Sequence, residues 1–358
     1  MWLRKLKIIN FKNHAAKEYE LNKGWVCITG LNGVGKTNIL DAIWFISNCR
    51  SYFGTTDQHL ILTNEIGFSI KTWVVGKQEM EVLCRLEKGK RKNFVVNESP
   101  VKKLSEHLGT IHLVFITPSD ISLVLDHSDE RRKFVDLALS KVYPDYLSHL
   151  EKYKKALESR NSQLKQFAKN NFVDLILLEP YSNILVHTAS PIYTYRKQFI
   201  EELNKDFAYF YSRLTQENEI ASINYASHLN DKNMQELLFQ NIEKDLILER
   251  TLKGIHADDL IFELNGFPLK KFASQGQIKS FVIAIKLALF VWTRNKTSQI
   301  PILLLDDIYE KIDGQRAEIL MQIISELKIE QVFVTDTHKE RVETNLKNLQ
   351  DHTFFIDL

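Results

Sequence analysis

The sequence of 358 residues contains few cysteines, namely Cys27, Cys49 and Cys84, and no Cys-x-x-Cys pair. Three scattered cysteines provide neither a disulfide framework nor the ligand spacing of a zinc site. No stretch approaches the 18 apolar residues of a membrane span, and the first residues lack the apolar run of a signal peptide. Internal repeats and low-complexity tracts are also missing. These absences predict a cytoplasmic globular protein with no membrane partner.

A strong excess of charge of one sign is missing as well. The chain carries 47 basic and 45 acidic residues, for a formal net charge of +2. This balance permits a nucleic-acid partner without demanding one. Hydrophobic residues make up 44% of the chain, which is ordinary for a folded protein, and the length is sufficient for two lobes. Composition alone therefore leaves the function open.

The most informative segment is a glycine-containing octapeptide between an apolar strand and an amphipathic helix. It fits the phosphate-binding loop pattern Gly-x-x-x-x-Gly-Lys-Thr and reads Gly30, Leu31, Asn32, Gly33, Val34, Gly35, Lys36, Thr37. Backbone N–H groups of such a loop and the N-terminus of the next helix surround phosphate oxygens. We predict that Lys36 binds the β- and γ-phosphates and assists catalysis, and that Thr37 binds Mg²⁺. A chance match in a turn is the alternative, and the flanking elements disfavour it.

A second apolar strand, at residues 301–305, ends in the two carboxylates Asp306 and Asp307. Next to a phosphate-binding loop, one carboxylate can hold Mg²⁺ while its neighbour orients the attacking water. We therefore predict that Asp306 is a metal ligand and Asp307 is catalytic. The alternative is a buried core strand whose end happens to be acidic.

A third motif consists of Ser274, Gly276 and Gln277, which open another helix with apolar residues on one side. An anion can be bound at such a helix N-terminus by a serine hydroxyl and by backbone N–H groups that glycine leaves accessible. The alternative is an ordinary capped helix, because Ser is a preferred N-cap residue. The interval from Ser274 to Asp306 suits one helix, one turn and one strand, which favours a second phosphate site.

The remaining pattern predicts an α/β fold with an inserted lobe. We expect helices from about 129 to 214, interrupted at Pro180 and Pro191, and again over 229–253. We predict a nucleotide-binding lobe made of residues 1–115 and 250–358, and an inserted, mainly helical lobe at 116–249. The predicted strands lie at 1–11, 17–21, 25–29, 68–75, 79–86, 92–97, 111–117, 302–305, 331–335 and 353–356.

The order of the three motifs resembles the ABC-type ATPases. The interval between Thr37 and Ser274 is too wide for a transporter's nucleotide-binding domain and too narrow for the coiled coils of SMC proteins. The chain is most similar in this respect to the RecF family of bacterial recombination mediators. Further segments follow that family's pattern, at residues 6–13, 115–120, 131–136, 143–161, 272–288 and 303–313.

This resemblance implies an ABC-type P-loop ATPase head that uses ATP and Mg²⁺, with slow hydrolysis as a switch. Ser274, Gly276 and Gln277 would contact the nucleotide of a second subunit, giving an ATP-dependent homodimer. Asp313 resembles the D-loop acid at that interface, although it can equally be a helix N-cap. His338 lies where such ATPases place a catalytic switch histidine, the alternative being a solvated loop histidine. His256 fits a structural hydrogen bond as well as a catalytic role.

The sequence departs from the family in three places. Ala257 replaces the usual basic residue before Asp258, which puts that residue's contact with nucleotide or DNA in doubt. Lys279 keeps a cation where the family has arginine but loses bidentate geometry. No Gln stands at 118–120, where related ATPases have their Q-loop.

The resemblance also implies a role in DNA repair and in maintaining replication forks. The protein would bind double-stranded and gapped DNA and single-stranded/double-stranded junctions, and would aid recombinase loading with RecO and RecR. Basic clusters are candidate DNA contacts, since cations near phosphates bind without reading sequence. Each cluster alone also fits a solvated face. The candidates are Lys90, Arg91 and Lys92, with Lys88 nearby; Arg131, Arg132 and Lys133; and Lys152, Lys154 and Lys155.

Other functions compete with this one. An ABC-type ATPase of a bacterial defence system, regulating a toxin or nuclease, shares the ATP motifs but usually lacks the 131–136 and 143–161 patterns. A transporter subunit is disfavoured by the long insertion. A GTPase is disfavoured because the sequence has no Asn-Lys-x-Asp motif for guanine.

Overall fold

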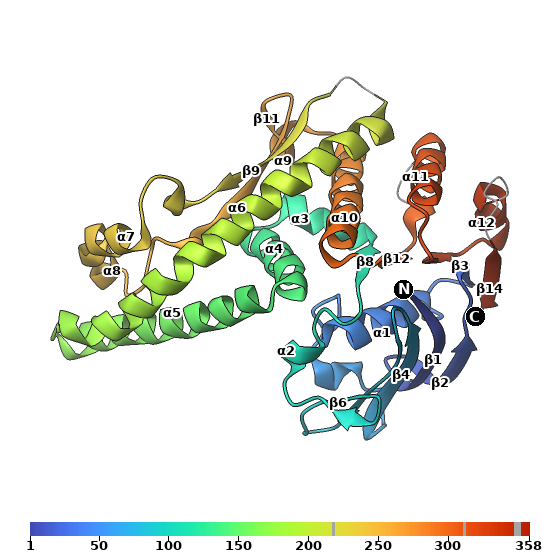
Figure 1. Cartoon of the computed structure of the whole chain (residues 1–358), viewed down its shortest axis with the longest axis horizontal. Coiled ribbons are helices and arrows are strands. Elements are labelled where there is room, and N and C mark those ends of the chain that lie inside the picture. The colour runs from blue at the N-terminus through green and yellow to red at the C-terminus, as the bar shows by residue number, and fades with distance from the viewer. Residues whose placement is uncertain (217–218, 311–312, 347–351) are drawn as a thin grey trace. The chain divides into compact units, whose positions relative to one another are not determined.

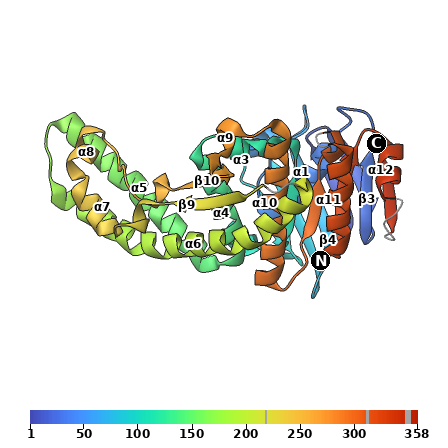
Figure 2. The same cartoon turned by 90° about the horizontal axis from the view of Figure 1, so that it is seen from above.

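The computed structural model describes residues 1–216, 219–310, 313–346 and 352–358, and Figures 1 and 2 show its elements in two views. The chain divides into two compact units. Unit 1 comprises Met1–Ile121, Tyr209–Asn218 and Ser274–Leu358, and unit 2 comprises Ser122–Ala208 and Glu219–Ala273. Unit 1 is therefore built from three separate stretches of sequence.

One layer of unit 1 is an antiparallel sheet with strand order β2-β1-β4-β5-β6-β7. Buried and partly buried residues alternate along its strands: in β4, Phe68 and Ile70 are buried, while Ser69 and Lys71, which point to the other face, are only partly buried. The strands are β1 (Trp2–Phe11), β2 (His14–Glu20), β4 (Gly67–Val75), β5 (Glu79–Glu87), β6 (Asn93–Val96) and β7 (Ser99–Pro100).

The other sheet of unit 1 is fully parallel, with order β14-β3-β13-β12-β8. Its strands are short, and β3, β8, β12 and β13 are almost wholly buried, as expected for a parallel sheet that is covered on both faces, whereas the edge strand β14 is mostly exposed. The strands are β3 (Gly24–Thr29), β8 (Leu113–Ile116), β12 (Ile302–Leu305), β13 (Gln331–Asp336) and β14 (Thr353–Asp357). Because the strands are parallel, their carboxyl ends share one edge, and in this class of sheet that edge binds ligands.

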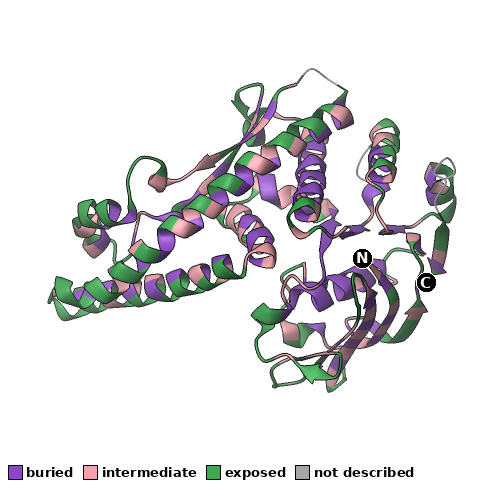
Figure 3. Ribbon diagram, viewed as in Figure 1, coloured by how far each residue is buried: buried purple, intermediate pink, exposed green. Residues whose placement is uncertain are grey.

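Helices pack on these sheets, and Figure 3 shows that α1 and α10 are largely buried. α10 is long and apolar enough to cross a membrane, so the expectation that no stretch approaches a membrane span is wrong. However, 78% of the most apolar 18-residue part of this helix is buried inside the fold. The helices of unit 1 are α1 (Lys36–Asn48), α2 (Leu104–His107), α10 (Gln275–Thr297), α11 (Gly314–Glu326) and α12 (Lys339–Leu346). Single turns are η1 (Asp57–Leu60), η2 (Pro118–Ile121) and η6 (Ile308–Glu310).

Unit 2 is dominated by α5 (Pro144–Asn170) and α6 (Glu179–Thr215), although α6 from Tyr209 onward belongs to unit 1. Leu164 and Phe167 of α5 pack with Leu178 against Ile242 and Leu246. The other helices are α3 (Ser122–Leu125), α4 (Ser128–Val142), α7 (Met234–Gln240), α8 (Ile242–Ile247) and α9 (Leu269–Phe272). Single turns are η3 (Leu175–Leu178), η4 (His228–Asn230) and η5 (Ile255–Ala257).

The predicted interruption of the second helical region is wrong, because α6 is continuous through Pro191. Pro180 lies in its first turn, where the missing N–H has no intrahelical partner in any case. Pro191 does remove an internal hydrogen bond. The fully buried side chains of Leu185, Ala189 and Ile192 around it supply packing that offsets this loss.

Unit 2 also contains a three-stranded antiparallel sheet of order β11-β10-β9. The strands are β9 (Ala221–Ala226), β10 (Asp259–Leu264) and β11 (Phe267–Pro268). Because β10 pairs with β9, residues 250–273 lie in unit 2 and not in the nucleotide-binding unit, where we had expected them. Conversely, 116–121 and 209–218 lie in unit 1. The predicted boundaries at 115/116 and 249/250 are corrected accordingly.

Candidate nucleotide-binding site

The phosphate-binding loop follows β3 and leads into α1 at the carboxyl edge of the parallel sheet. Gly30, Gly33 and Gly35 have φ angles of 151°, 85° and 109°, which L side chains rarely adopt. Leu31, Asn32 and Gly33 are exposed at the tip of the loop and Val34 is partly buried. The ammonium of Lys36 donates to the carbonyls of Gly30 and Leu31 at 2.9 and 3.1 Å. The ammonium is thus held against the backbone of the predicted phosphate-binding loop.

The turn between β1 and β2 supports this loop, which the sequence analysis did not anticipate. Asn13 donates to the carbonyl of Val34 at 3.0 Å, and the His14 ring nitrogen Nε2 lies 3.0 Å from the carbonyl oxygen of Gly35. A Cβ at Gly35 would lie 2.6 Å from the Asn13 amide and 2.7 Å from His14, so the glycine allows a close approach. Burial lowers the pKa of His14 and favours its neutral form.

The end of β12 meets the start of α1 through Thr37 and Asp306. The Thr37 hydroxyl oxygen lies 2.8 and 3.0 Å from the two carboxylate oxygens of Asp306, which is 5% exposed. A hydroxyl and a carboxylate are oxygen ligands of the kind that Mg²⁺ prefers beside nucleotide phosphates. The two side chains predicted as metal ligands are therefore brought together. Burial raises the pKa of Asp306, while hydrogen bonds from Thr335 and Thr37 act in the opposite direction.

Thr335, at the end of β13, connects the two acids of this motif, and the sequence analysis did not single it out. Its hydroxyl donates to Oδ1 of Asp306 at 2.8 Å and accepts the backbone N–H of Asp307 at 2.9 Å. Asp307 has a φ of 43°, an unusual conformation for a residue with a side chain. Thr335 is completely buried, and its hydroxyl joins the Asp306 carboxylate to the backbone of Asp307.

No group of three or more His, Cys, Asp or Glu side chains suited to a metal occurs in the described part of the chain. A Mg²⁺ ion bound with nucleotide would take its ligands from Thr37, Asp306 and phosphate oxygens. The glycines with positive φ, the buried ammonium and the oxygen pair fit ATP and Mg²⁺. When bound, ATP would supply the phosphoanhydride that is cleaved.

The signature residues open α10. Ser274 is its N-cap, and its Oγ accepts the N–H of Gln277 at 3.2 Å while the Gln277 side chain accepts the N–H of Ser274 at 2.7 Å. This capping box is the ordinary structural role considered for the motif. In this capping box the Ser274 oxygen is the acceptor, so its hydroxyl proton is still available for a hydrogen bond to another group. Ser274 is also exposed. Gly276 lies in the same first turn.

Asp313 and His338 occupy loops next to α11 and α12. Asp313 is the N-cap of α11, accepting the N–H of Arg316 at 3.0 Å, which was the structural alternative for this residue. Lys311 and Ile312 of the D-loop pattern lie outside the described residues. His338 is exposed, and its backbone N–H donates to Asp336 at 2.7 Å. Its predicted contact with the γ-phosphate stays a prediction.

The loop after β8, where the family of ATPases would have its Q-loop, holds a buried ion pair instead. Asp120 binds the ammonium of Lys286 on α10 at 2.8 Å and accepts the backbone N–H of Thr117 at 2.7 Å. Tyr52 donates to the same carboxylate. The pair ties α10 to this loop, and it could not be predicted from local sequence because its partners are 166 residues apart.

The basic cluster at 90–92 is only partly free. Lys92 is 16% exposed, pairs with Asp57 at 2.8 Å and donates to the carbonyl of Cys49. Its charge is therefore engaged within unit 1, and its predicted contact with DNA stays a prediction. Lys90 pairs with Glu87 on the surface, where such pairs contribute little. Arg91 is exposed.

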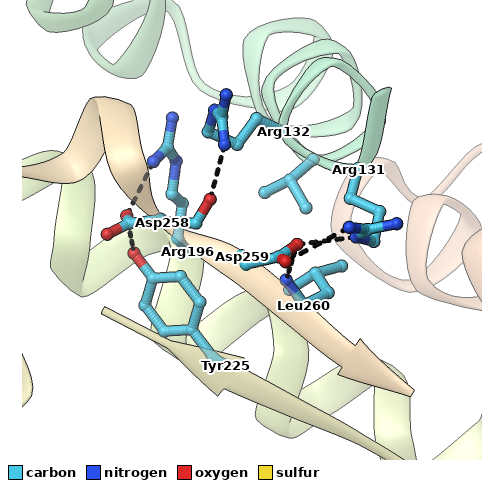
Figure 4. Close-up of a pocket in the computed structure, with 8 residues that line it drawn as sticks. Arg131, Arg132, Arg196, Tyr225, Asp258, Asp259 and Leu260 are labelled. Atoms are coloured by element: carbon cyan, nitrogen blue, oxygen red, sulfur yellow. Dashed lines mark hydrogen bonds and ion pairs between the residues drawn. The ribbon is translucent and has the colours of Figure 1, made fainter. Parts of the chain in front are cut away.

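Two members of the cluster at 131–133, Arg131 and Arg132, are likewise engaged inside unit 2, where they line a small pocket (Figure 4). Arg131 binds Asp259 through two nitrogens at 2.6 and 3.1 Å, and Arg132 donates to the carbonyl of Asp258 at 2.7 Å. Arg131 is 11% exposed. Both arginines tie α4 to the start of β10 and the residue before it, and their predicted contact with DNA stays a prediction. Lys133 remains 59% exposed beside Asp129 and Glu130.

The same pocket contains a second buried ion pair. Arg196 binds Asp258 at 2.8 Å and Asp136 at 2.8 Å, and Tyr225 also donates to Asp258. Burial raises the pKa of Asp258, and Arg196 opposes that shift. These contacts join α6 to both β10 and α4.

His256 has a structural role in unit 2. Its Nδ1 lies 2.7 Å from the Tyr153 hydroxyl and its Nε2 lies 2.9 Å from the carbonyl of Thr251. Burial lowers the pKa of His256 to about 4, so it is neutral near pH 7. Ala257 beside it is exposed, and a basic residue there would reach solvent.

Comparison with known proteins places this arrangement in a class. Residues 2–354 match the RecF/RecN/SMC N terminal domain family. SMC head domains share the fold: one from Pyrococcus furiosus has a TM-score of 0.56 at 18% identity and covers 96% of this chain and 91% of its own. The fold and site thus define an ABC-type ATPase of the RecF and SMC class.

Curated relatives narrow the class. "DNA replication and repair protein RecF" of Flavobacterium johnsoniae is 38% identical over 349 residues, covering 97% of both chains. The protein of the same name from Cytophaga hutchinsonii is 35% identical over 358 residues, covering 99% of this chain and 95% of that one. A solved structure of the recombination mediator protein RecF with ATP in the RecFOR pathway has a TM-score of 0.88 at 27% identity, covering 99% of this chain and 95% of that chain. The chain belongs to the RecF family.

Proposed function

We propose that this protein is an ATP-dependent DNA-binding switch of recombinational repair and replication-fork maintenance. The observation that carries the proposal is the hydrogen-bonded pair of Thr37 and Asp306, which joins the phosphate loop to the acidic strand end within unit 1. Relatives named for DNA replication and repair cover nearly the whole chain, so the proposal extends to the protein and not only to its ATPase motifs.

Each residue of the site has a defined task in this proposal. Lys36 and the backbone of 30–37 bind the β- and γ-phosphates, and Thr37 and Asp306 hold Mg²⁺. Asp307 accepts a proton from the attacking water, oriented by its backbone bond to Thr335. His338 contacts the γ-phosphate after rearrangement of its exposed side chain. Hydrolysis is slow and serves to end the bound state.

ATP binding would join two copies of the chain. Ser274, Gly276 and Gln277 of one copy would then face the nucleotide of the other, with Asp313 at the same interface. The exposed position of Ser274 supports this, because a buried signature could not reach a partner. The dimer would bind double-stranded and gapped DNA through cations that remain exposed, namely Lys90, Arg91, Lys133, Lys152, Lys154 and Lys155. RecO and RecR are the proposed partners, and recombinase loading is the proposed outcome.

Light scattering tests the central step. The wild-type protein is measured with ATP and Mg²⁺, with and without a gapped duplex, next to the variant Ser274→Arg. We expect wild-type dimers only with ATP, and monomers that still bind ATP for the variant, because a long cation at the cap clashes with the facing phosphate loop. Wild-type protein that stays monomeric with ATP, or binds DNA equally with and without it, would refute the switch and favour the defence-system alternative.

A further inference from the structure

An arginine of α11 lies against the signature turn. A Cβ built on Gly276 would be 2.7 Å from Nη1 of Arg316, so the guanidinium fills the space beside this glycine. Its Nε lies 3.4 Å from Oδ2 of Asp313. One cation therefore touches both the signature glycine and the D-loop acid of its own chain.

The groups around this arginine are mainly hydrogen-bond donors. Ser274 can donate its hydroxyl, and helix geometry leaves the first N–H groups of α10 without intrahelical acceptors. Arg316 adds a planar fork of N–H groups that matches phosphate oxygens. The described hydrogen bonds and ion pairs of Ser274 and Arg316 include none to the phosphate loop of the same chain. This cluster of hydrogen-bond donors is therefore suited to bind an anionic group that belongs to another molecule.

The present partner of Arg316 can be exchanged at little cost. The Asp313 side chain is 57% exposed, and the separation of 3.4 Å is longer than that of a good charge-assisted hydrogen bond. Surface pairs of this kind contribute on the order of 0–1 kcal/mol. A phosphate carrying several negative charges competes easily with such a carboxylate.

We propose that Arg316 binds the γ-phosphate of the ATP held by a second copy of the chain. It provides the cationic element of the signature side of the composite site, opposite Lys36 on the phosphate-loop side. This inference rests on the proposed ATP-dependent dimer and names a phosphate contact beyond Ser274 and Gly276. Movement of Arg316 from Asp313 to phosphate also links the D-loop to the nucleotide of the partner.

The first test compares Arg316→Gln and Arg316→Lys with wild type, using Arg294→Gln near the other end of α10 as the matched control. We expect Arg316→Gln monomers to bind ATP as wild type does. The ATP turnover of this variant, measured under conditions in which the wild-type protein dimerises, falls roughly 10²–10³-fold, the usual effect of removing one preorganised donor. Arg316→Lys keeps a charge and loses less, and Arg294→Gln changes neither quantity. Wild-type turnover in Arg316→Gln would overturn the inference.

Mixed dimers decide whether Arg316 acts on the partner's nucleotide. Arg316→Gln is mixed with Asp307→Asn, which is expected to bind ATP and dimerise, and each variant alone is expected to turn over little ATP. A hybrid contains one site with an intact phosphate loop and Asp307 from the first variant and an intact signature side from the second. We expect about one quarter of wild-type turnover, since half of randomly formed symmetric dimers are hybrids with one intact site.

No recovery in the mixture would mean that Arg316 acts within its own chain or only supports the fold, and would overturn the inference. Thermal unfolding of each variant verifies that both are folded. Failure of the wild-type protein to dimerise with ATP is a separate result, which would refute the proposed function and this inference with it. Wild-type dimers with fully active Arg316→Gln subunits would refute the inference alone.

Discussion

The Thr335 hydroxyl lies 2.8 Å from Oδ1 of Asp306, at the ends of two neighbouring parallel strands. The hydroxyl oxygen of Thr335 also accepts the backbone N–H of Asp307, whose φ of 43° this bond helps to hold. One buried hydroxyl therefore links the carboxylate of Asp306 to the backbone of Asp307.

Replacing Thr335 with Val should impair hydrolysis more than ATP binding. The change keeps the shape but leaves the Asp307 N–H without its acceptor, at a cost of about 1–3 kcal/mol. We expect lower turnover and a higher Mg²⁺ requirement, measured by phosphate release over a magnesium titration. Thr335→Ser, which restores the hydroxyl, should recover most of the activity. Equal loss in both variants would assign the effect to packing.

Lys36→Ala should abolish ATP binding and, with it, DNA retention. The β- and γ-phosphate charge would lose its cation in a loop built around one. A fluorescent-nucleotide titration measures the binding, and Lys23→Ala, an exposed lysine paired with Glu330, is the control. Wild-type affinity in Lys36→Ala would remove the basis of the phosphate-loop assignment.

Asp307→Asn should keep ATP affinity and slow hydrolysis roughly 10²–10⁴-fold, the usual contribution of a positioned base. The variant should accumulate as an ATP-bound dimer, visible by size-exclusion chromatography with light scattering. Undiminished turnover would place the base elsewhere, with Glu310 and His338 as the next candidates.

DNA binding should be sequence-indifferent and sensitive to salt. With about 4–8 phosphates neutralised, the slope of log K against log salt should be near −4 to −7. Charge reversal at Lys90 and Arg91 should reduce this slope by roughly one for each lost contact. Arg131→Ala should leave the slope unchanged and lower the stability of unit 2 by about 2 kcal/mol, because Asp259 loses its charged partner. A slope that changes only with Arg131 would restore that residue as a DNA contact.

The stability of unit 2 should fall as pH decreases from about 6.5 toward 4. The pKa of His256 is lowered to about 4 in the folded state, so in this window the unfolded chain binds a proton that the folded chain refuses. The slope from this residue is at most about 1.4 kcal/mol per pH unit. Hydrogen exchange of the β9–β10 amides at pH 7 and pH 5 measures it. His256→Gln should flatten the dependence, and an identical dependence in both proteins would contradict the assignment.

Much of the nucleotide-binding unit could be predicted from sequence, because its signals are local. The strands before Gly30 and Asp306 are short apolar runs next to motif residues, and the structure places them at 24–29 and 302–305. The class of fold was confirmed by the family match and the solved RecF structure. The residues of such a motif determine both the chemistry of the site and the local backbone conformation, so both can be predicted from a short stretch of sequence.

What could not be predicted depends on distant partners. Arg131 and Lys92 looked like free surface cations, since their acceptors Asp259 and Cys49 are remote in sequence. β9 and β10 each show the alternating burial of a strand, but this local signal does not reveal that the two strands pair across residues 227–258. Pro191 was predicted to break a helix because local propensity cannot register the buried packing of α6.

The order of the parallel sheet has a consequence for folding during synthesis. β3, which leads to the phosphate loop, lies between β13 and β14, and these strands lie at Gln331–Asp336 and Thr353–Asp357. Such long-range pairings form slowly, and β3 lacks both neighbours until the ribosome has added the residues up to Asp357. A nascent chain that is shorter than this therefore has an incomplete nucleotide site.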